Sequence, residues 1–247
     1  MKILGVIPAR FASTRFPGKP LALIHGVSMI QRVYIQSQKA ASLADVVVAT
    51  DDERIFKHVL EFGGRVVITS SDHPSGTDRC AEVLRNNDSG FDAVVNIQGD
   101  EPFIKPTQID LLTSCFSDPS CQIATLVKKI SSKEELENSN TPKVVMGEKG
   151  RAVYFSRRAV PFVPDSRVSE HIQQGSFFKH IGIYAYRADI LGQLAALPPT
   201  QAEKMESLEQ LRWLCNGISI HTRVTNDDSH AVDVPGDIQV IERLYSI

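Results

Sequence analysis

Three cationic side chains lie within ten residues near the start of the chain: Arg10, Arg15 and Lys19. No acidic residue precedes Asp45, so no neighbour in sequence neutralises them. Arginine presents a planar fork of donors to phosphate oxygens, and lysine presents a mobile point charge. The chemistry that this stretch favours is therefore phosphate binding. A solvated basic loop is the alternative that charge alone leaves open.

The surroundings of this basic loop favour ligand binding. It follows the apolar run Ile3–Ile7, which has the length and composition of a buried strand. Open α/β sheets hold their ligands at the carboxyl ends of strands. The sequence Pro17-Gly18-Lys19-Pro20 predicts a rigid turn that fixes the direction of Lys19. The loop is not a P-loop, because Pro20 stands where Ser or Thr is needed, and no G-x-G-x-x-G dinucleotide motif follows the strand.

Two acids further along the chain are candidates for binding a divalent cation. Asp100 follows the predicted strand Ala93–Ile97, and Asp233 lies between a predicted strand and a helix opened by Pro235. An acid at the carboxyl end of a central parallel strand points into the crevice that also receives the basic loop. Mg²⁺ prefers carboxylate, water and phosphate oxygens. Capping of the helix that follows is the alternative role for each acid.

A third polar segment, His73-Pro74-Ser75-Gly76-Thr77-Asp78-Arg79, stands at the start of a predicted helix. Free backbone N–H groups and small side chains at such a helix start allow close approach of a base or a ribose. An ordinary capped helix start is the alternative.

Candidates for binding the second substrate lie in the C-terminal half. Arg157 and Arg158 end a predicted strand and offer cations to a carboxylate. His180 and Tyr184 are four residues apart on a predicted strand, so they face the same side, with Tyr186 alongside. A structural histidine and ordinary strand tyrosines are the alternatives.

A predicted helix over 203–215 supplies three more polar candidates. Glu206, Glu209 and Gln210 are spaced i, i+3 and i+4 and would share one helix face. A solvated helix face explains the same spacing.

The elements that position these residues alternate between strand and helix in the first half. We predict strands over 3–7, 46–49, 66–68 and 93–97. We also predict three helices: one from an N-cap at Ser28 to about residue 39, a second that ends at about residue 62, and a third from about 78 to 86. Short connections between them predict an α/β fold: a mostly parallel twisted sheet with helices on both faces.

The pattern changes at about residue 123, which predicts a smaller mixed-sheet lobe. We expect strands over 123–127, 143–146, 152–155, 180–186, 218–221 and 231–234, and helices over 187–197, 203–215 and from 235 onward. The polar segment 160–175 reads as a long exposed excursion. We expect a single α/β domain over 1–247, with one lobe over 1–120, a second over 121–230 and a return to the main sheet over 231–247.

Overall composition excludes several classes of function. A net charge of −2 gives no pull toward nucleic acid or an anionic membrane. Four cysteines without a C-x-x-C motif predict reduced thiols of a cytosolic protein. The first strand follows Met1-Lys2 directly, which argues against a signal peptide, and no apolar run approaches the ~20 residues of a membrane span. We expect a cytoplasmic protein with no nucleic-acid partner and no membrane insertion.

Several motifs resemble those of one enzyme family. PARFASTRFPGKPL, QGDEP and SGTDR are similar to motifs of the sugar nucleotidyltransferases, and the first looks like the N-terminal motif of the 3-deoxy-manno-octulosonate (Kdo) cytidylyltransferases, also called CMP-Kdo synthetases. YFSR, KHIGIYAYR and E-x-L-E-Q-L-R resemble the Kdo-binding segments of that family. The family motif V-D-T-P-x-D is altered here, because Val234 replaces the Thr and Gly236 the usual Glu. The resemblance runs from Ile3 to about Ile241.

The resemblance implies a nucleotide-diphospho-sugar transferase-like fold and the reaction CTP + Kdo → CMP-Kdo + pyrophosphate, for lipopolysaccharide synthesis. It also implies Mg²⁺ as cofactor, a homodimer formed through the lobe 121–230, and CTP and an acidic eight-carbon sugar as partners. A cytidylyltransferase for 8-amino-Kdo or sialic acid, and a non-catalytic nucleotide-binding module, remain alternatives.

The same resemblance implies four groups of site residues. The catalytic residues would be Arg10, Lys19, Asp100 and Asp233, the last two as metal ligands. The nucleotide would contact Pro8, Ala9, Arg10, Ser13, Lys19, His73, Ser75, Gly76, Thr77, Arg79, Gln98 and Gly99. The sugar would contact Arg15, Gln98, Arg157, His180, Tyr184, Tyr186, Glu209 and Gln210.

Overall fold

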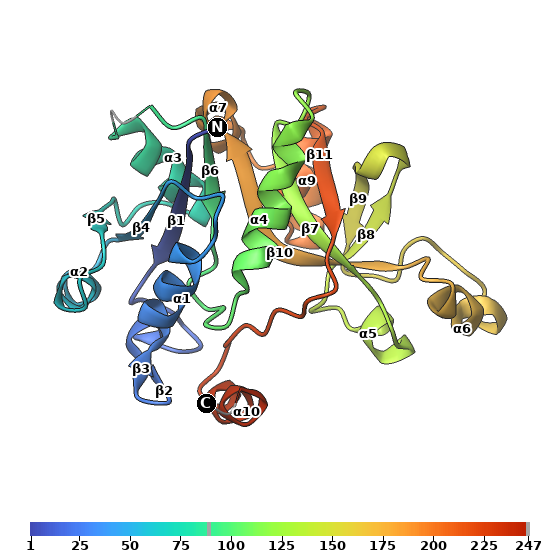
Figure 1. The fold of residues 1–247 in the computed structure, drawn as a ribbon. Helices are drawn as coiled ribbons and strands as arrows, with labels where there is room; N and C mark the ends of the chain where they lie inside the picture. Colours follow the sequence, from blue (N-terminus) through green and yellow to red (C-terminus); the bar gives the residue numbers. More distant parts are fainter. Residues whose placement is uncertain (88–89, 246–247) are drawn as a thin grey trace. The chain divides into compact units, whose positions relative to one another are not determined.

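The computed structural model describes residues 1–87 and 90–245 (Figure 1). The chain forms two compact units. Unit 1 comprises Met1–Asp110 and Ser229–Ile247, and unit 2 comprises Leu111–Asp228. The expected lobe boundaries at 120/121 and 230/231 stay a prediction.

Unit 1 is built on a parallel sheet in the order β6-β1-β4-β5. Its strands are β1 (Ile3–Ala9), β4 (Asp45–Thr50), β5 (Val66–Ile68) and β6 (Ala93–Asn96). The strands β1 and β4 are near-continuous apolar runs buried along most of their length, as expected where helices cover both faces of a parallel sheet. Four strands that were predicted from the sequence are therefore confirmed.

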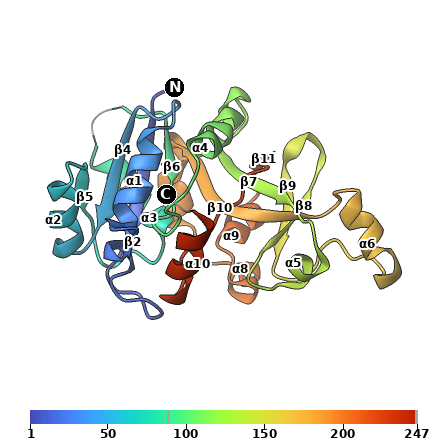
Figure 2. The ribbon, with the colours of Figure 1, turned by 60° about the horizontal axis from the view of Figure 1, so that its bottom comes forward.

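Three helices connect these strands: α1 (Met29–Gln38), α2 (Glu53–Glu61) and α3 (Gly76–Arg85). The chain adds β4 and β5 on one side of β1 and then returns to place β6 on the other side. Because such crossovers are right-handed, reversing their direction puts α3 on the opposite face from α1, as Figures 1 and 2 show. The order of the strands thus reverses between β1 and β6.

Each of these helices begins at a side chain that accepts a backbone N–H. Ser28 accepts from Gln31, and Asp52 accepts from Arg54. Ser75 accepts from the amide of Asp78, so α3 begins at Gly76, two residues earlier than predicted. A capping side chain satisfies one of the N–H groups that the first turn of a helix leaves unpaired.

The remaining elements of unit 1 are short or terminal: η1 (Lys19–Leu21), β2 (Leu23–Ile24), β3 (Val27–Ser28) and α10 (Gly236–Leu244). Helix α4 (Pro106–Thr113) contains the boundary with unit 2. The predicted strand over 231–234 is wrong, because its backbone forms no ladder there. Val232 instead donates one backbone hydrogen bond to Asp100, 2.9 Å long, and packs with Ile241 of α10.

Unit 2 contains a mixed sheet. Strand β11 pairs parallel with β7, β7 pairs antiparallel with β10, and β8 pairs antiparallel with both β10 and β9. The strands are β7 (Ile123–Lys129), β8 (Lys143–Met146), β9 (Ala152–Ser156), β10 (Phe178–Arg187) and β11 (Ile220–Val224). The helical segments are η2 (Ser114–Ser117), α5 (Lys133–Glu137), η3 (Glu148–Gly150), α6 (Asp165–Gln173), α7 (Ala188–Ala196), α8 (Gln201–Glu206) and α9 (Gln210–Cys215).

Two sequence predictions fail in unit 2. The segment 160–175, expected as a long exposed excursion, is largely exposed but is not a loop, because it contains α6, whose Val168 packs with Leu136 and Phe177. The predicted helix over 203–215 is two helices, broken at Ser207, whose φ of 52° is left-handed. Glu206 and Gln210 consequently lie on different helices and do not share one helix face.

None of the helices within residues 1–87 and 90–245 is both long enough and apolar enough to cross a membrane.

Candidate active site

A cavity of about 400 Å³ lies beside the loops that leave β1 and β6. These are the two neighbouring strands between which the strand order reverses, and that is where open α/β sheets bind ligands. Lining residues come from both loops, and include nine of the predicted site residues: Pro8, Ala9, Arg10, Ser13, Arg15, Lys19, Gln98, Gly99 and Asp100.

The basic loop is fixed by the turn that the sequence predicts. Gly18 has a φ of +71°, and its N–H donates to the carbonyl of Phe11 at 2.9 Å. A side chain at Gly18 would be strained by that φ and would meet the Phe11 ring. The turn directs the ammonium of Lys19 to Asp100 Oδ2 at 2.6 Å and to the carbonyl of Val232 at 2.9 Å.

The loop after β6 passes close to the loop after β1. A Cβ added to Gly99 would lie 2.8 Å from the carbonyl oxygen of Pro8. Glycine is therefore required where the two backbones approach each other. This contact places Asp100 beside Lys19, as the sequence interpretation predicts.

Asp233 reaches the same network from the far end of the chain. Its Oδ1 accepts from the guanidinium of Arg15 at 2.8 Å, and both side chains are more than half exposed. The carboxylate of Asp237 accepts from the backbone N–H groups of Asp233 at 2.7 Å and Val234 at 2.9 Å. The backbone N–H of Val234, the residue that replaces the family's Thr, thus has an acceptor. The cap position of α10 is Pro235, so Asp233 is not its N-cap.

The donor chemistry of this network fits a hard divalent cation. Asp100 and the residue before Asp233 share a backbone hydrogen bond, and Lys19 binds both of them. No group of three or more His, Cys, Asp or Glu side chains suited to a metal occurs among residues 1–87 and 90–245. Mg²⁺ is commonly held by one or two carboxylates together with substrate phosphates. Asp100 lines the cavity, and Asp233 follows Val232, which is hydrogen-bonded to Asp100. Each carboxylate is paired with a cation in the structure described here.

Glu101 is a residue of this loop whose environment the sequence interpretation missed. It is buried, and its Oε2 has no hydrogen-bond partner. Burial, and then the charge of Asp100, raise the pKa of Glu101 to about 7, while a hydrogen bond from Ser229 acts in the opposite direction. The neighbours of Glu101 in sequence, Asp100 and Pro102, do not indicate that its side chain is buried.

The segment predicted to bind the nucleotide lies against Arg10. The guanidinium of Arg10 donates to the carbonyl of His73, and the ring of His73 contacts the carboxylate of Glu82. Burial, and then the positive charge of Arg79, lower the pKa of Arg10. Two cations thus lie close together beside the loop that is predicted to approach the base and ribose of the nucleotide.

Arg79 is completely buried in unit 1. It donates to the hydroxyl of Thr69, and to Asp51 Oδ2 at 3.0 Å. Asp51 follows β4 and Thr69 follows β5, so Arg79 of α3 connects two loops at the carboxyl edge of the sheet. The role of Arg79 in nucleotide contact stays a prediction, because its guanidinium already has partners in the protein. Ser75, Gly76 and Thr77 form the cap and first turn of α3.

The predicted aromatic candidates gather on one side of β10 in unit 2. The ring centroids of His180 and Tyr184 are 5.1 Å apart, and those of Tyr184 and Tyr186 are 6.0 Å apart. Trp213 of α9 packs edge-on against both tyrosines. Burial lowers the pKa of His180 to about 3, and its Nε2 is 2.9 Å from the hydroxyl of Thr125. His180 is therefore neutral at pH 7.

The polar sugar-side candidates are engaged within unit 2. Arg157 donates from Nε to the carbonyl of Glu206 at 2.7 Å and from Nη2 to the carbonyl of Ser207 at 3.1 Å. Gln210 is buried, and its Nε2 has no hydrogen-bond partner. Glu209 immediately precedes α9. The guanidinium of Arg157, which the sequence interpretation assigned to a carboxylate of the sugar, thus binds backbone carbonyls at the break between α8 and α9.

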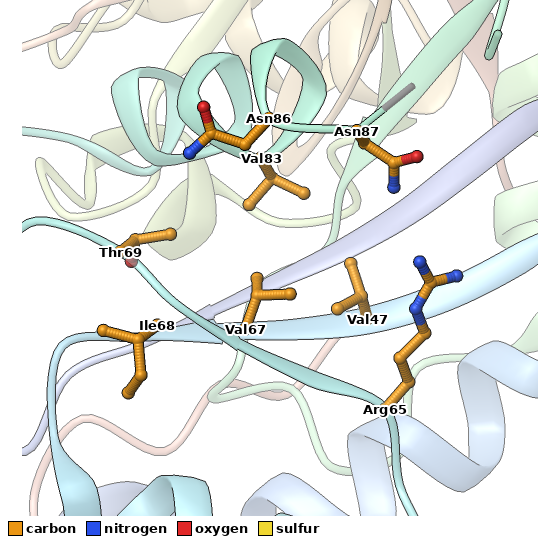
Figure 3. A pocket seen from close by; sticks show the side chains of 8 residues that line it. All are labelled: Val47, Arg65, Val67, Ile68, Thr69, Val83, Asn86 and Asn87. Carbon is orange, nitrogen blue, oxygen red and sulfur yellow. The ribbon is translucent and has the colours of Figure 1, made fainter. Parts of the chain in front are cut away.

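A separate cavity of about 200 Å³ lies between the outer strands of unit 1 and the end of α3 (Figure 3). Figure 3 shows Val47, Val67 and Val83 converging on it from β4, β5 and α3, with Arg65 at its rim. None of the predicted site residues lines this cavity.

The fold and the site define a class: a nucleotide-binding α/β protein with cations and acids at the switch point of a parallel sheet. Residues 4–220 match the family model described as Cytidylyltransferase. A Bacteroides thetaiotaomicron protein named 3-deoxy-manno-octulosonate cytidylyltransferase is 51% identical over 245 residues, which cover 98% of this chain and 97% of that one. The chain belongs to the cytidylyltransferase family.

Solved structures agree with this assignment. A CMP:2-keto-3-deoxy-manno-octonic acid synthetase complexed with CTP superposes with a TM-score of 0.90 at 41% identity, covering 99% of this chain and 98% of that one. A 4-diphosphocytidyl-2C-methyl-D-erythritol synthase from Anaerococcus prevotii has a TM-score of 0.62 at 13% identity, covering 98% and 96%, and supports the fold alone. The predicted fold class and the resemblance to the Kdo cytidylyltransferases are confirmed.

Proposed function

We propose that this protein activates Kdo with CTP, forming CMP-Kdo and pyrophosphate. The observation that carries the proposal is the meeting of Lys19, Asp100 and the segment before Asp233 in one hydrogen-bonded network at the switch point of the sheet. The names of the full-length relatives support CTP and Kdo as the substrates.

The reaction is an in-line transfer, in which the anomeric 2-hydroxyl of Kdo attacks the α-phosphate of CTP and pyrophosphate leaves. Such a transfer needs positioning and neutralisation of charge more than covalent help. Arg10 and Lys19 supply positive charge to the triphosphate and to the departing pyrophosphate. The Lys19 side chain is only 16% exposed, so water screens its charge weakly.

Asp100 and Asp233 would hold Mg²⁺. When bound, Mg²⁺ neutralises phosphate charge and makes a nearby hydroxyl more acidic. Lys19 and Arg15 are the partners of the two carboxylates. Arg15 would offer its guanidinium to the carboxylate of the sugar.

The aromatic side of β10 suits the body of a sugar. His180 and Tyr184 present a neutral, largely desolvated surface with few rotatable bonds, and Gln210 brings an amide without a hydrogen-bond partner. A buried amide that lacks a partner gains free energy when a ligand hydroxyl pairs with it. We assign Arg15 and Gln98 of unit 1, and Arg157, His180, Tyr184, Tyr186, Glu209 and Gln210 of unit 2, to the sugar.

Three further properties belong to the proposal: a cytoplasmic location, assembly as a homodimer and a role in lipopolysaccharide synthesis. Its free cysteines, Cys80, Cys115, Cys121 and Cys215, are consistent with a reducing compartment. Sedimentation equilibrium of the purified protein tests the homodimer, and a monomer at micromolar concentration would contradict it.

Pyrophosphate release over the four nucleoside triphosphates, with and without Kdo, tests the function. We expect release only with CTP, Mg²⁺ and Kdo together. A panel containing 8-amino-Kdo and sialic acid separates the related sugar specificities. Absence of CTP-dependent release under all conditions would leave a nucleotide-binding module as the function.

A further inference from the structure

Glu82 of helix α3 lies behind the loop formed by residues 70–75, which we term the nucleotide loop. Its Oε2 accepts the backbone N–H of Ser70 at 3.0 Å and contacts Nε2 of the His73 ring. The side chains of Glu82 and His73 are only 16% and 18% exposed. Burial alone would raise the pKa of Glu82, but the bonds from His73 and Ser70 outweigh it and lower that pKa. Glu82 is therefore an ionised acceptor that holds the loop at two points.

The nucleotide loop is also tied down at its two ends. Before it, the N–H of Thr69 donates to the carbonyl of Thr50 at 2.9 Å. At its other end, Ser75 caps α3. Glu82 secures the middle of the loop, where His73 lies. The carbonyl of His73 is thus fixed relative to both the sheet and α3.

That carbonyl accepts a hydrogen bond from Arg10. Arg10 follows β1, and the charge of Arg79 acts unfavourably on its guanidinium, while the charges of Asp51 and Asp78 partly offset it. A guanidinium near a second cation needs a fixed acceptor to keep one orientation, because electrostatic repulsion favours its departure. The His73 carbonyl supplies that acceptor.

We propose that Glu82 is a positioning residue for nucleotide binding: by holding Ser70 and His73, it fixes the carbonyl that orients Arg10 toward the triphosphate. The inference rests on the proposed function, since it takes the triphosphate of CTP as the partner of Arg10. Glu82 acts through His73 and Arg10, and need not touch the nucleotide.

Steady-state kinetics of Glu82→Ala test the proposal. We expect the KM for CTP to rise about tenfold, because a loosely held guanidinium must be ordered when the nucleotide binds. The KM for Kdo should stay within about twofold, since Glu82 acts on the nucleotide side. Glu82→Gln should recover most of the CTP KM, because its amide oxygen still accepts from Ser70 or His73.

A double-mutant cycle with Arg10→Ala distinguishes positioning from general loss of structure. If Glu82 acts through Arg10, adding Glu82→Ala to Arg10→Ala should change the CTP KM by less than about twofold. Full additivity of the two effects would overturn the proposal. If Glu82→Ala does not fold, His73→Phe replaces it, because this variant removes the ring contact and keeps the backbone carbonyl.

Glu61→Ala is the matched control. Glu61 also pairs with a histidine, with 3.7 Å between its Oε2 and His58 Nδ1, but it is 75% exposed on α2. The control variant should leave both KM values and kcat unchanged.

Amide hydrogen exchange of the nucleotide loop needs no substrate and separates this inference from the proposed function. We expect residues 70–75 to exchange at least about tenfold faster in Glu82→Ala than in wild type or Glu61→Ala. Unchanged exchange, or an unchanged CTP KM in an active enzyme, overturns the inference. Failure of the wild-type protein to release pyrophosphate overturns the proposed function instead, and the exchange data then still decide whether Glu82 holds the loop.

Discussion

The predicted site residues differ in charge and packing between the loops of unit 1 and the aromatic cluster on β10 of unit 2. In unit 1 four of these residues form two ion pairs between distant segments: Lys19 with Asp100, and Arg15 with Asp233. In unit 2 the cluster of His180, Tyr184, Tyr186 and Trp213 is neutral, and its rings pack directly against one another.

The difference predicts how each region would meet its proposed ligand. Charged partners that are partly exposed exchange for a ligand's charges at modest cost, because the protein pair is replaced by another pair. Packed aromatic rings lose little conformational entropy on binding, because they are already ordered. We therefore expect the loops of unit 1 to bind the polyanion with its cation, and the β10 cluster to bind an uncharged surface of the sugar.

The largest expected effect tests the charged region. Lys19→Ala or Asp100→Ala should lower kcat by about 10²-fold or more, comparable to the loss of one preorganised electrostatic contact. Initial-rate measurements at saturating CTP and Kdo give this value. Lys57→Ala, which removes an exposed lysine of α2 paired with Glu53, is the control and should be neutral. Losses below tenfold in both site variants would remove these residues from the site.

A smaller effect is expected in the β10 cluster. His180→Ala should raise the KM for Kdo about five- to tenfold and leave the KM for CTP nearly unchanged, because the ring is a neutral packing and hydrogen-bonding surface. Titrating each substrate at a saturating concentration of the other provides the two values. A selective rise in the CTP KM would contradict the division of substrates between the two regions.

The buried histidine also predicts how stability depends on pH. The pKa of His180 is lowered from 6.5 to about 3, so between these values the unfolded chain binds a proton that the folded protein does not. The free energy of unfolding should therefore fall as the pH drops below 6.5, by about 1 kcal/mol from pH 6 to pH 5 for this group. Urea unfolding at several pH values measures the slope. His180→Gln should flatten it, and an unchanged slope would show that the ring is solvated.

The smallest effect is expected for the exposed pair of unit 1. Arg15→Ala should change the free energy of unfolding by less than about 0.5 kcal/mol, because its contact with Asp233 is solvent-exposed. Urea unfolding at pH 7 tests this, and the KM for Kdo of the same variant should rise. A loss of stability above about 2 kcal/mol would mean that the pair is structural and would weaken the contrast with the β10 cluster.

Much of the fold was predictable because local patterns specify it. Ser28 caps its helix at the position that the sequence predicts, and β8 has the predicted bounds. The failures also have local causes. The helix α6 was not predicted because its segment is polar and Val168 is the one residue that it buries. The helix break at Ser207 was not predicted because its left-handed backbone is usually adopted by glycine, and the sequence has serine there.

The sequence by itself determined the chemical groups of the site and the turn that directs Lys19, because residue type and short-range backbone preferences act within a few residues. Only the tertiary structure decided the partners: Asp100 lies 81 residues from Lys19, and Asp233 lies 218 residues from Arg15. The same holds for Glu82 behind His73 and for the burial of Glu101 and Arg79. The order of strands in the sheet brings such residues together, and no local pattern in the chain encodes that order.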